Sequence, residues 1–222
     1  MRKKIAVIAV LATVAISLGS MHPHLLHAEQ HAASEIPGGY TIISGGNVTA
    51  TYNFSSNAGV DRWAYRHQTS SQPPDTNDTP DMAFNASQYA RIAADEDTRQ
   101  IDRATAWFSH AAHRFVFTIA QNKSTITLLH VSWNGGGVHT GSTDGAILYL
   151  WNHTAGAYDQ LDSTTLDTEV TLEETLSAGA NYIDTAGNLT ALVVQQRRTF
   201  LFWYSYIATD YIEIAVTHTG GT

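Results

Sequence analysis

After about residue 40 the chain consists of short runs of β-forming residues, each closed by a turn signal, and this pattern constrains the fold most. In residues 113–120, Phe115, Phe117 and Ile119 alternate with other side chains, and residues 212–216 repeat the alternation. A period of two places one set of side chains on the buried face of a strand. Turn signals recur every eight to fifteen residues and hardly any segment is an amphipathic helix. The pattern therefore predicts an antiparallel β-sandwich or barrel.

We expect strands at residues 40–44, 48–54, 88–93, 113–120, 125–133, 146–151, 158–162, 170–175, 189–195, 200–204 and 206–216. Gly45-Gly46-Asn47 joins the first two as a hairpin-type turn, and Asn134-Gly-Gly-Gly137 is expected to end the fifth run. Residues 70–81 contain Pro73, Pro74 and Pro80, so they form a long polar loop. Residues 170–177 are open to a helical alternative, which the β-rich context disfavours.

The N-terminus has the pattern of a signal peptide. Arg2, Lys3 and Lys4 precede an uninterrupted run of apolar and small residues that ends at Leu18, which suits a secretory core and is short for a membrane span of about 20 residues. Gly19 and Ala28 are the two candidate cleavage sites. We expect a signal peptide at residues 1–28, a flexible leader at 29–39 and a single β-sandwich domain at 40–222. No second apolar run of membrane length follows, so the mature chain is expected to have no transmembrane span.

Composition excludes several functions. The 222 residues contain no cysteine and only 14% charged residues, with a formal net charge of −8. Disulfides, thiolate metal sites and thiol nucleophiles are therefore excluded. A negative chain without basic clusters also makes nucleic acid an unexpected partner. Thr, Ser, Asn and Gly replace the missing charge, as in turn-rich β proteins outside cells.

Asn-x-Ser/Thr acceptor patterns are enriched, which is typical of an N-glycosylated surface protein. They begin at Asn47, Asn53, Asn77, Asn85, Asn122, Asn152 and Asn188. The alternative is that a Thr-rich β protein accumulates such patterns by composition. Together with the signal peptide, they predict an extracellular or cell-surface location.

Three groups of residues resemble a β-sandwich domain of exported archaeal proteins. They are Tyr89-x-x-Ile92-x-x-Asp95, Ala112-His-Arg-Phe-Val-Phe-Thr-Ile119 and Ile126-Thr-Leu-Leu-His-Val-Ser-Trp-Asn-Gly135. The resemblance covers about residues 60–217. It implies an all-β, antiparallel sandwich of the jelly-roll type, similar to galactose-binding-like modules. Such modules are mostly non-catalytic and belong to surface or polymer-binding proteins, although a fold alone does not define a function.

The sequence contains no recognisable catalytic motif. Carboxylates cluster as Asp95-Glu96-Asp97 and as Glu173-Glu174, and a glycosidase would need two carboxyl groups facing each other across a cleft. Sequence cannot establish that geometry, so we expect a protein that is not an enzyme and keep a secreted glycan-active hydrolase as an alternative.

No cofactor is certain, and calcium is the most physical candidate because jelly-roll sandwiches can hold a hard cation on carboxylates of their loops. The candidate ligands are Asp75, Asp78 and Asp81 in the proline-rich loop, with Asp95 and Asp97 in the next loop. The alternative is that these residues are solvated acidic turns. His22, His24, His27 and His31 could hold a transition metal if cleavage follows Gly19, whereas cleavage after Ala28 removes most of this cluster. His110 and His113 are expected to be ordinary edge or loop residues.

The aromatic run at residues 200–204 carries the best ligand hypothesis. In a strand, Phe202 and Tyr204 would share one face and Trp203 the other, so one set is expected to be exposed unless both faces are covered. The candidate ligand-binding residues are Phe202, Trp203, Tyr204 and Trp151. Glycan binding, self-association and plain core packing all remain open for this run.

The expected function is therefore non-catalytic, in surface structure, adhesion or filament-like self-assembly, with the chain itself or a cell-surface glycan as partner. Self-assembly could use donation of the β-prone segment 40–54 to a neighbouring copy, which would satisfy the backbone of an open sheet edge. A carbohydrate-binding module is the alternative.

Overall fold

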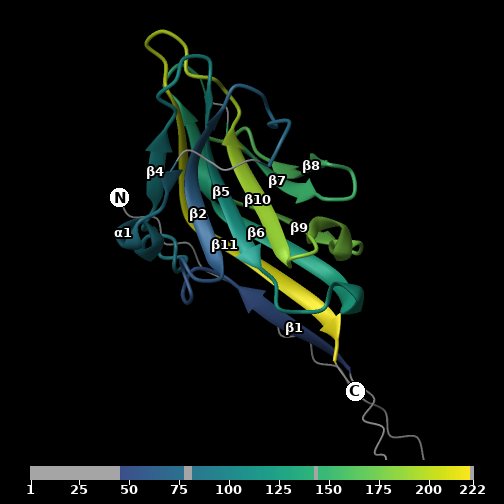
Figure 1. Cartoon of the computed structure of the whole chain (residues 1–222). Helices are drawn as coiled ribbons and strands as arrows, with labels where there is room; N and C mark the ends of the chain where they lie inside the picture. Colours follow the sequence, from purple (N-terminus) through teal and green to yellow (C-terminus); the bar gives the residue numbers. More distant parts are fainter. Residues whose placement is uncertain (1–45, 78–81, 143–144, 221–222) are drawn as a thin grey trace, which may run out of the picture. The chain divides into compact units, whose positions relative to one another are not determined.

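Two antiparallel sheets face one another and enclose the hydrophobic core (Figure 1). The computed structural model describes residues 46–77, 82–142 and 145–220, which all belong to one compact unit, Ile42–Thr222. The strands are β1 Asn47–Tyr52, β2 Arg62–Thr69, β3 Met82–Ala83, β4 Gln100–Arg103, β5 His110–Thr118, β6 Ile126–His139, β7 Ala146–Asn152, β8 Ala157–Ser163, β9 Val170–Leu176, β10 Asn188–Gln195 and β11 Ser205–Thr219. The helical elements are α1 Ala86–Ala90 and the short 3-10 helices η1 Lys123–Thr125 and η2 Gly179–Tyr182.

The strand order is that of an eight-stranded jelly roll with three additional strands, β3, β4 and β5. One sheet has the order β1-β11-β6-β9, with β4 also pairing with β11, and the other has the order β3-β2-β5-β10-β7-β8. All of these pairs are antiparallel. With β3, β4 and β5 set aside, β1-β11-β6-β9 opposite β2-β10-β7-β8 is the arrangement of a double-sheet jelly roll. The predicted all-β sandwich is confirmed, and β5 is inserted between β2 and β10.

The core lies between the two sheets, where the alternating side chains of both inner faces meet. Its largest fully buried side chains include Trp133, Phe115, Phe117, Leu129 and Leu148. A second, smaller cluster lies on the sheet with the order β3-β2-β5-β10-β7-β8. It consists of Ala112, Tyr149, Trp151, Tyr158, Leu192 and Val194. The central strands β5 and β10 are therefore buried along almost their whole length, which accounts for their near-continuous apolar sequences.

Most of the predicted strands are present. The runs at residues 48–54, 113–120, 146–151, 189–195 and 206–216 correspond to β1, β5, β7, β10 and β11. The run at 158–162 is β8, which forms the expected hairpin with β7, and residues 170–176 are the strand β9 and not a helix. β1 pairs with β11 at the far end of the sequence. The run at 40–44, the signal peptide and the leader lie outside the described residues.

The strand predicted at residues 88–93 is wrong, because α1 lies there. Asn85 caps α1, accepting hydrogen bonds from the backbone N–H groups of Ser87 and Gln88, while the Gln88 side chain accepts from the Asn85 N–H. This reciprocal arrangement is a capping box. The prediction took Tyr89 and Ile92 as flanks of a strand, but residues three apart share one face of a helical turn.

The end predicted for the strand at Asn134-Gly-Gly-Gly137 is also wrong, because β6 continues through these glycines to His139. A side chain on Gly135 would overlap the carbonyl oxygen of Ala208 in the neighbouring strand, and one on Gly137 would overlap Gly145. The glycines therefore permit a close backbone approach inside the sandwich, which is the other reason for glycine in a strand. β2 and β4 were not predicted, because their sequences are rich in polar residues.

Candidate functional site

Three loop segments meet at the end of the sandwich that lies away from the C-terminus (Figure 1). They precede β5, follow β6 and connect β10 to β11. The Phe108 N–H donates to the Thr199 carbonyl oxygen at 2.9 Å, and the Thr199 N–H donates to the Ser109 carbonyl oxygen at 2.8 Å. The Tyr204 N–H donates to Thr140 Oγ1 at 2.8 Å. These bonds join the three segments into one surface.

Residues 200–203 form a tight turn within this surface, so the strand predicted at 200–204 is wrong. Phe200 and Trp203 exchange two backbone hydrogen bonds of 2.9 Å each. Leu201, between them, has a positive φ of 54°, which is rare for a bulky residue. The aromatic side chains therefore project from a turn and do not alternate across a sheet. Exposure follows from this geometry, and Phe202 is 85% exposed.

An aromatic rim, defined here as Phe108, Phe200 and Trp203, borders a pocket in this surface. The ring centroids of Phe108 and Phe200 are 5.5 Å apart, and those of Phe200 and Trp203 are 6.5 Å apart. The three side chains remain between 40% and 52% exposed. The Trp203 indole packs on Gly141, where an added Cβ would lie 2.7 Å from the indole Cγ. The rim is therefore held in place and remains accessible.

The pocket has a volume of about 630 Å³ and a polar lining beneath the rim. The other lining residues are Gln72, His110, His139, Gly141, Ser142, Gln196, Arg197 and Arg198. Among the described residues, this lining contains two arginines and no carboxylate, although the whole chain has a formal net charge of −8. A concave site with aromatic walls and a few convergent polar groups is the usual form of a ligand pocket.

Hydrogen bonds fix the two histidines of the lining. His110 Nδ1 lies 2.8 Å from the carbonyl oxygen of Gln195, and Arg198 Nε donates to His110 Nε2 at 3.3 Å. His139 Nε2 lies 3.1 Å from the carbonyl oxygen of Arg198. Burial lowers the pKa of His110, and the charge of Arg198 lowers it further. His110 is therefore a neutral group that positions Arg198.

Two of the positive-φ residues other than glycine flank the pocket. Phe108 has φ 59° and Leu201 has φ 54°. Strained backbone of this kind persists only where the surroundings enforce it, and it is concentrated at ligand-binding and active sites. Its presence in both loops that carry the aromatic rim marks the pocket as the leading candidate for a binding site.

The structure brings together some of the predicted ligand-binding residues and separates others. Trp203 belongs to the aromatic rim, and Tyr204 lies beside it, with the Arg103 guanidinium 4.6 Å from its ring centroid. Phe202 is exposed at the same turn but does not line the pocket. Trp151 is only 8% exposed and packs on Tyr158 in the smaller cluster of the other sheet, so it does not belong to this site.

The sequence analysis did not identify Phe108, His110, His139 or Arg198 as members of a site. Their positions depend on the pairing of three loops that lie far apart in the sequence. The aromatic run at residues 200–204 is the one sequence signal of this site, because it marks one of the three loops.

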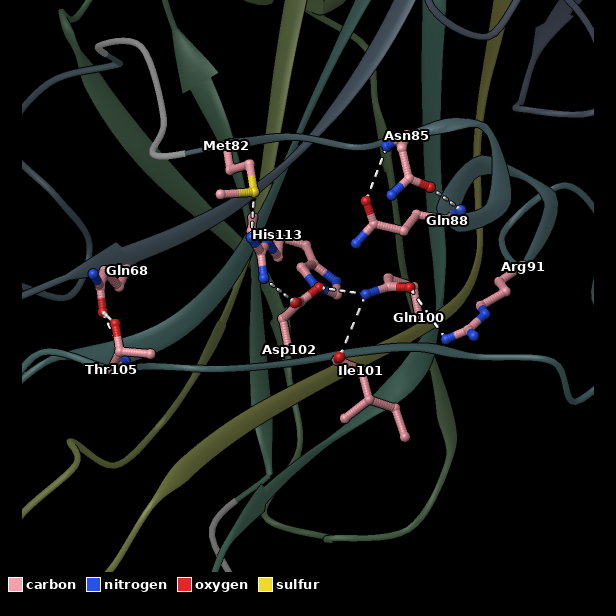
Figure 2. Close-up of polar contacts among 11 residues, drawn as sticks. Gln68, Met82, Asn85, Gln88, Arg91, Gln100, Ile101, Asp102, Thr105 and His113 are labelled. Carbon is pink, nitrogen blue, oxygen red and sulfur yellow. Dashed lines mark hydrogen bonds and ion pairs between the residues drawn. The ribbon is translucent and has the colours of Figure 1, made fainter.

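A second group of polar residues, buried between the sheets, links β5 to β4 and β11. His113 Nε2 lies 3.0 Å from Asp102 Oδ2, and Gln100 Nε2 donates to the same oxygen at 2.7 Å (Figure 2). On its other side, His113 Nδ1 lies 2.8 Å from Thr209 Oγ1, which accepts a hydrogen bond from Trp133 Nε1 at 2.9 Å. A neutral imidazole with its proton on Nε2 satisfies every one of these bonds.

This group has the order of a hydroxyl–imidazole–carboxylate triad but not its accessibility. His113 and Thr209 are both fully buried, so no substrate can reach the Thr209 hydroxyl. Burial lowers the pKa of His113 despite the nearby Asp102. The arrangement is therefore a polar connection between the two sheets.

The acidic residues converge at a different place from the one predicted. Asp95, Glu169 and Asp210 each bring a carboxylate oxygen within 4.8 Å of the others. Burial, together with the nearby Asp95 and Glu169, raises the pKa of Asp210 to about 6. Asp97 contributes only its backbone N–H, which donates to Asp210 Oδ2 at 3.1 Å. Asp75 is exposed and is not part of the cluster, and Asp78, Asp81 and the leader histidines lie outside the described residues.

Four of the predicted glycosylation patterns form turns in which the asparagine accepts hydrogen bonds from the residue two positions later. Oδ1 of Asn53, Asn85 and Asn122 accepts hydrogen bonds from both the backbone N–H and the hydroxyl of the serine two positions later. Asn152 accepts from the Thr154 N–H. These are Asx-turns, so local folding is a second physical reason for the pattern. Among the other three, Asn47 is exposed, whereas Asn77 and Asn188 are half-buried.

Residues 59–218 match the family AF_1625_C, described as "Uncharacterized protein, C-terminal domain". This match covers most of the chain, and the chain belongs to that family. It spans β2 to β11 and so includes both the aromatic rim and the acidic cluster.

No curated protein gives a significant match. Among solved structures, the chain is similar to a carbohydrate-binding module specific for non-crystalline cellulose, with 12% identity and a TM-score of 0.18 over 55% of this chain and 70% of that one. A similarity at this level carries no argument about function. Within the described residues, no helix is long and apolar enough to cross a membrane.

Proposed function

We propose that the chain is a non-catalytic, extracellular domain that binds acidic glycans through the pocket bordered by the aromatic rim. The observation that carries the proposal is the combination of exposed aromatic side chains with two arginines in the pocket lining, whose described residues include no carboxylate. The apolar faces of sugar rings stack on aromatic side chains, and arginine recognises carboxylate groups with its paired donors. A glycan containing uronic acids presents both features.

The described residues that line the pocket include no carboxylate, and this argues against the hydrolase alternative at this site. Glycoside hydrolysis needs a carboxylic acid and a carboxylate on either side of the scissile bond, and the described lining residues provide neither. Asp95 belongs to the separate acidic cluster, and Glu173 and Glu174 lie exposed on β9. Binding without chemistry is therefore the function that this geometry supports best.

The predicted signal peptide, the Asn-x-Ser/Thr patterns and the resemblance to exported archaeal surface domains support a role in adhesion at the cell surface. Donor-strand assembly receives no support from this single chain, in which Asn47–Tyr52 pairs with β11 of the same molecule. Assembly into filaments remains a second proposal, and size-exclusion chromatography of the secreted protein tests it directly.

The test of glycan binding is a titration of the protein with polygalacturonate and with a neutral galactan. We expect binding to the acidic polymer only. Trp203→Ala should weaken it about tenfold or more, which corresponds to about 1.4 kcal/mol. Phe202→Ala is the matched control, because Phe202 belongs to the same turn and is highly exposed but does not line the pocket.

Arg198→Gln tests the acidic character of the ligand. Removal of the guanidinium should weaken binding to polygalacturonate and make the residual binding less sensitive to salt. Equal affinity of the wild-type protein for neutral and acidic polymers would contradict the proposal, and so would an unchanged affinity of Trp203→Ala. Circular dichroism shows whether each variant is folded.

A further inference from the structure

Asp210 lies at a β-bulge in β11, which turns its side chain out of the regular alternation. Thr209 pairs with Gly135 and Tyr211 pairs with Asn134, so Asp210 has no partner residue on β6. Extra residues of this kind re-aim a side chain and are common next to functional sites. The inward-facing positions of β11 change phase at this point, so both Thr209 and Asp210 are fully buried.

The buried Asp210 carboxylate is only half satisfied by hydrogen bonds. Its Oδ2 accepts from the Asp97 N–H at 3.1 Å, whereas Oδ1 has no hydrogen-bond partner in the described part of the chain. An unpaired buried carboxylate oxygen is costly, and a proton or a bound ion is needed to compensate it. The Asp210 side chain lies beside the carboxylates of Asp95 and Glu169. Ionised carboxylates only accept hydrogen bonds, so neither neighbour can donate one to Asp210.

Three separate segments bring these carboxylates together. Asp95 belongs to the loop before β4, Glu169 precedes β9 and Asp210 lies in β11. Their closest oxygens all lie within 4.8 Å of one another. With calcium–oxygen distances of about 2.3–2.6 Å, oxygens on opposite sides of one calcium ion are about 5 Å apart. One ion can therefore contact all three.

The surroundings suit a hard cation. Asn134 Nδ2 donates to Asp95 Oδ1 at 3.1 Å, while the Asn134 amide oxygen is buried without a hydrogen-bond partner among the described residues. Arg99 forms a salt bridge with Glu169. Among the salt bridges of the described residues, it supplies the single positive charge near the cluster. Three carboxylates against one guanidinium leave the cluster negative.

From this geometry we infer that Asp95, Glu169 and Asp210 bind one calcium ion, which ties the loop before β4 to β11 and to the start of β9. An all-oxygen set with several carboxylates fits calcium better than magnesium, which usually keeps most of its water and takes one or two carboxylates. The site is separate from the aromatic rim and does not depend on glycan binding.

The test is calcium titration of the calcium-stripped, full-length chain by calorimetry, followed by thermal unfolding with calcium or with EDTA. We expect one ion per chain and an unfolding midpoint that rises with the logarithm of calcium concentration, since a ligand that binds only the folded state stabilises it. Asp210→Asn should abolish both effects. Asp95→Asn, at an exposed position, should weaken binding at least tenfold without a risk to folding.

Glu96→Gln is the matched control, because it removes the same charge from the same exposed loop outside the cluster. It should bind calcium like the wild type. The inference is overturned if the wild-type chain binds no calcium at millimolar concentration, or if Asp95→Asn binds it unchanged. It is also overturned if Asp210→Asn stabilises the protein equally with calcium and with EDTA, which would identify a proton shared between two carboxyl groups.

Discussion

At the scale of single residues, Gly135 shows how the absence of one side chain permits close packing of the sheet. It lies in the middle of β6, where an added Cβ would overlap the carbonyl oxygen of Ala208 and the ring of Trp133. Neither neighbour can move easily, because one is backbone and the other is fully buried. The site therefore excludes any side chain.

Gly135→Ala should destabilise the protein by about 1–3 kcal/mol, the usual cost of overpacking a well-packed core. Urea unfolding measures this change. Gly46→Ala is the control, because an added Cβ there meets nothing within 4 Å, and its free energy of unfolding should change by less than about 0.5 kcal/mol. Equal stability of the two variants would show that the strands separate to accommodate the methyl group.

His113 makes stability depend on pH. Burial lowers the pKa of His113 below its ordinary value of 6.5, so the unfolded chain takes up the proton first as the pH falls. The contribution of His113 to the free energy of unfolding is therefore fully present above about pH 6.5 and is lost as the pH falls below that value. The charged groups facing the imidazole are Asp102 from β4 and Arg66 from β2, and both influence the pKa of His113. Thr209 from β11 and the rings of Phe84 and Phe115 complete its surroundings.

His113→Gln should make the free energy of unfolding less dependent on pH between about pH 7.5 and 5.5, because one group with a lowered pKa is removed. The variant will also be less stable at every pH, so the informative quantity is the slope. His110 and His153 also have lowered pKa values and remain in the variant, which leaves part of the slope. An unchanged slope would contradict this prediction, because it would show that the pKa of His113 is the same in the folded and the unfolded chain.

At the scale of elements, the turn at residues 200–203 depends on a glycine in another loop. Gly141 provides the flat surface on which the Trp203 indole lies. Gly141→Ala should displace the indole and weaken polygalacturonate binding severalfold, while thermal stability changes little because the loop is partly exposed. Gly46→Ala serves again as the control for a glycine away from the rim. Full retention of binding would show that the indole position does not matter to the ligand.

Strands with a continuous apolar or alternating sequence were predicted correctly, because the pattern of apolar residues directly indicates burial on one or both faces of a strand. The errors occurred where a long-range contact decides the local structure. The glycines of β6 indicate a strand end from their local sequence, whereas their actual role depends on the close approach of the distant Ala208. Residues 200–204 form a turn because Phe200 and Trp203 pair with each other across Leu201. The lining of the pocket could not be predicted for the same reason: it is assembled from three loops.

The calcium ligands illustrate a related limit. Asp95 was a candidate from its acidic neighbours in the sequence, but Asp210 occupies a β-bulge in an otherwise regular alternating strand. Nothing in the local pattern distinguishes a buried aspartate in a bulge from an exposed one. Glu169 joins them only because β9 pairs with β6.

At the scale of the whole molecule, low charge and many Asn-x-Ser/Thr patterns are consistent with solubility supplied by attached glycans, and the structure separates accessible patterns from engaged ones. Asn85 and Asn122 are exposed, and their Nδ2 atoms make no hydrogen bond among the described residues. By contrast, Asn53 Nδ2 donates to Tyr211 Oη at 2.8 Å and Asn152 Nδ2 donates to Asp159 Oδ2 at 2.8 Å. A glycan attached at Nδ2 needs an open path to solvent.

Glycosylation of the folded protein should therefore occur at Asn47, Asn85 and Asn122 and be low or absent at Asn53, Asn152 and Asn188. At Asn188, Nδ2 donates to Asp184 Oδ2 and the Thr190 of the pattern is only 3% exposed. Mass spectrometry of peptides from protein secreted by a host with N-glycosylation measures the occupancy of each site. Replacing Asn85 and Asn122 by Gln should remove most of the attached mass and lower solubility, whereas Asn188→Gln should leave the attached mass unchanged. High occupancy at Asn188 would show that the sugars are added before β10 pairs with β5, and accessibility in the folded domain would then not select the sites.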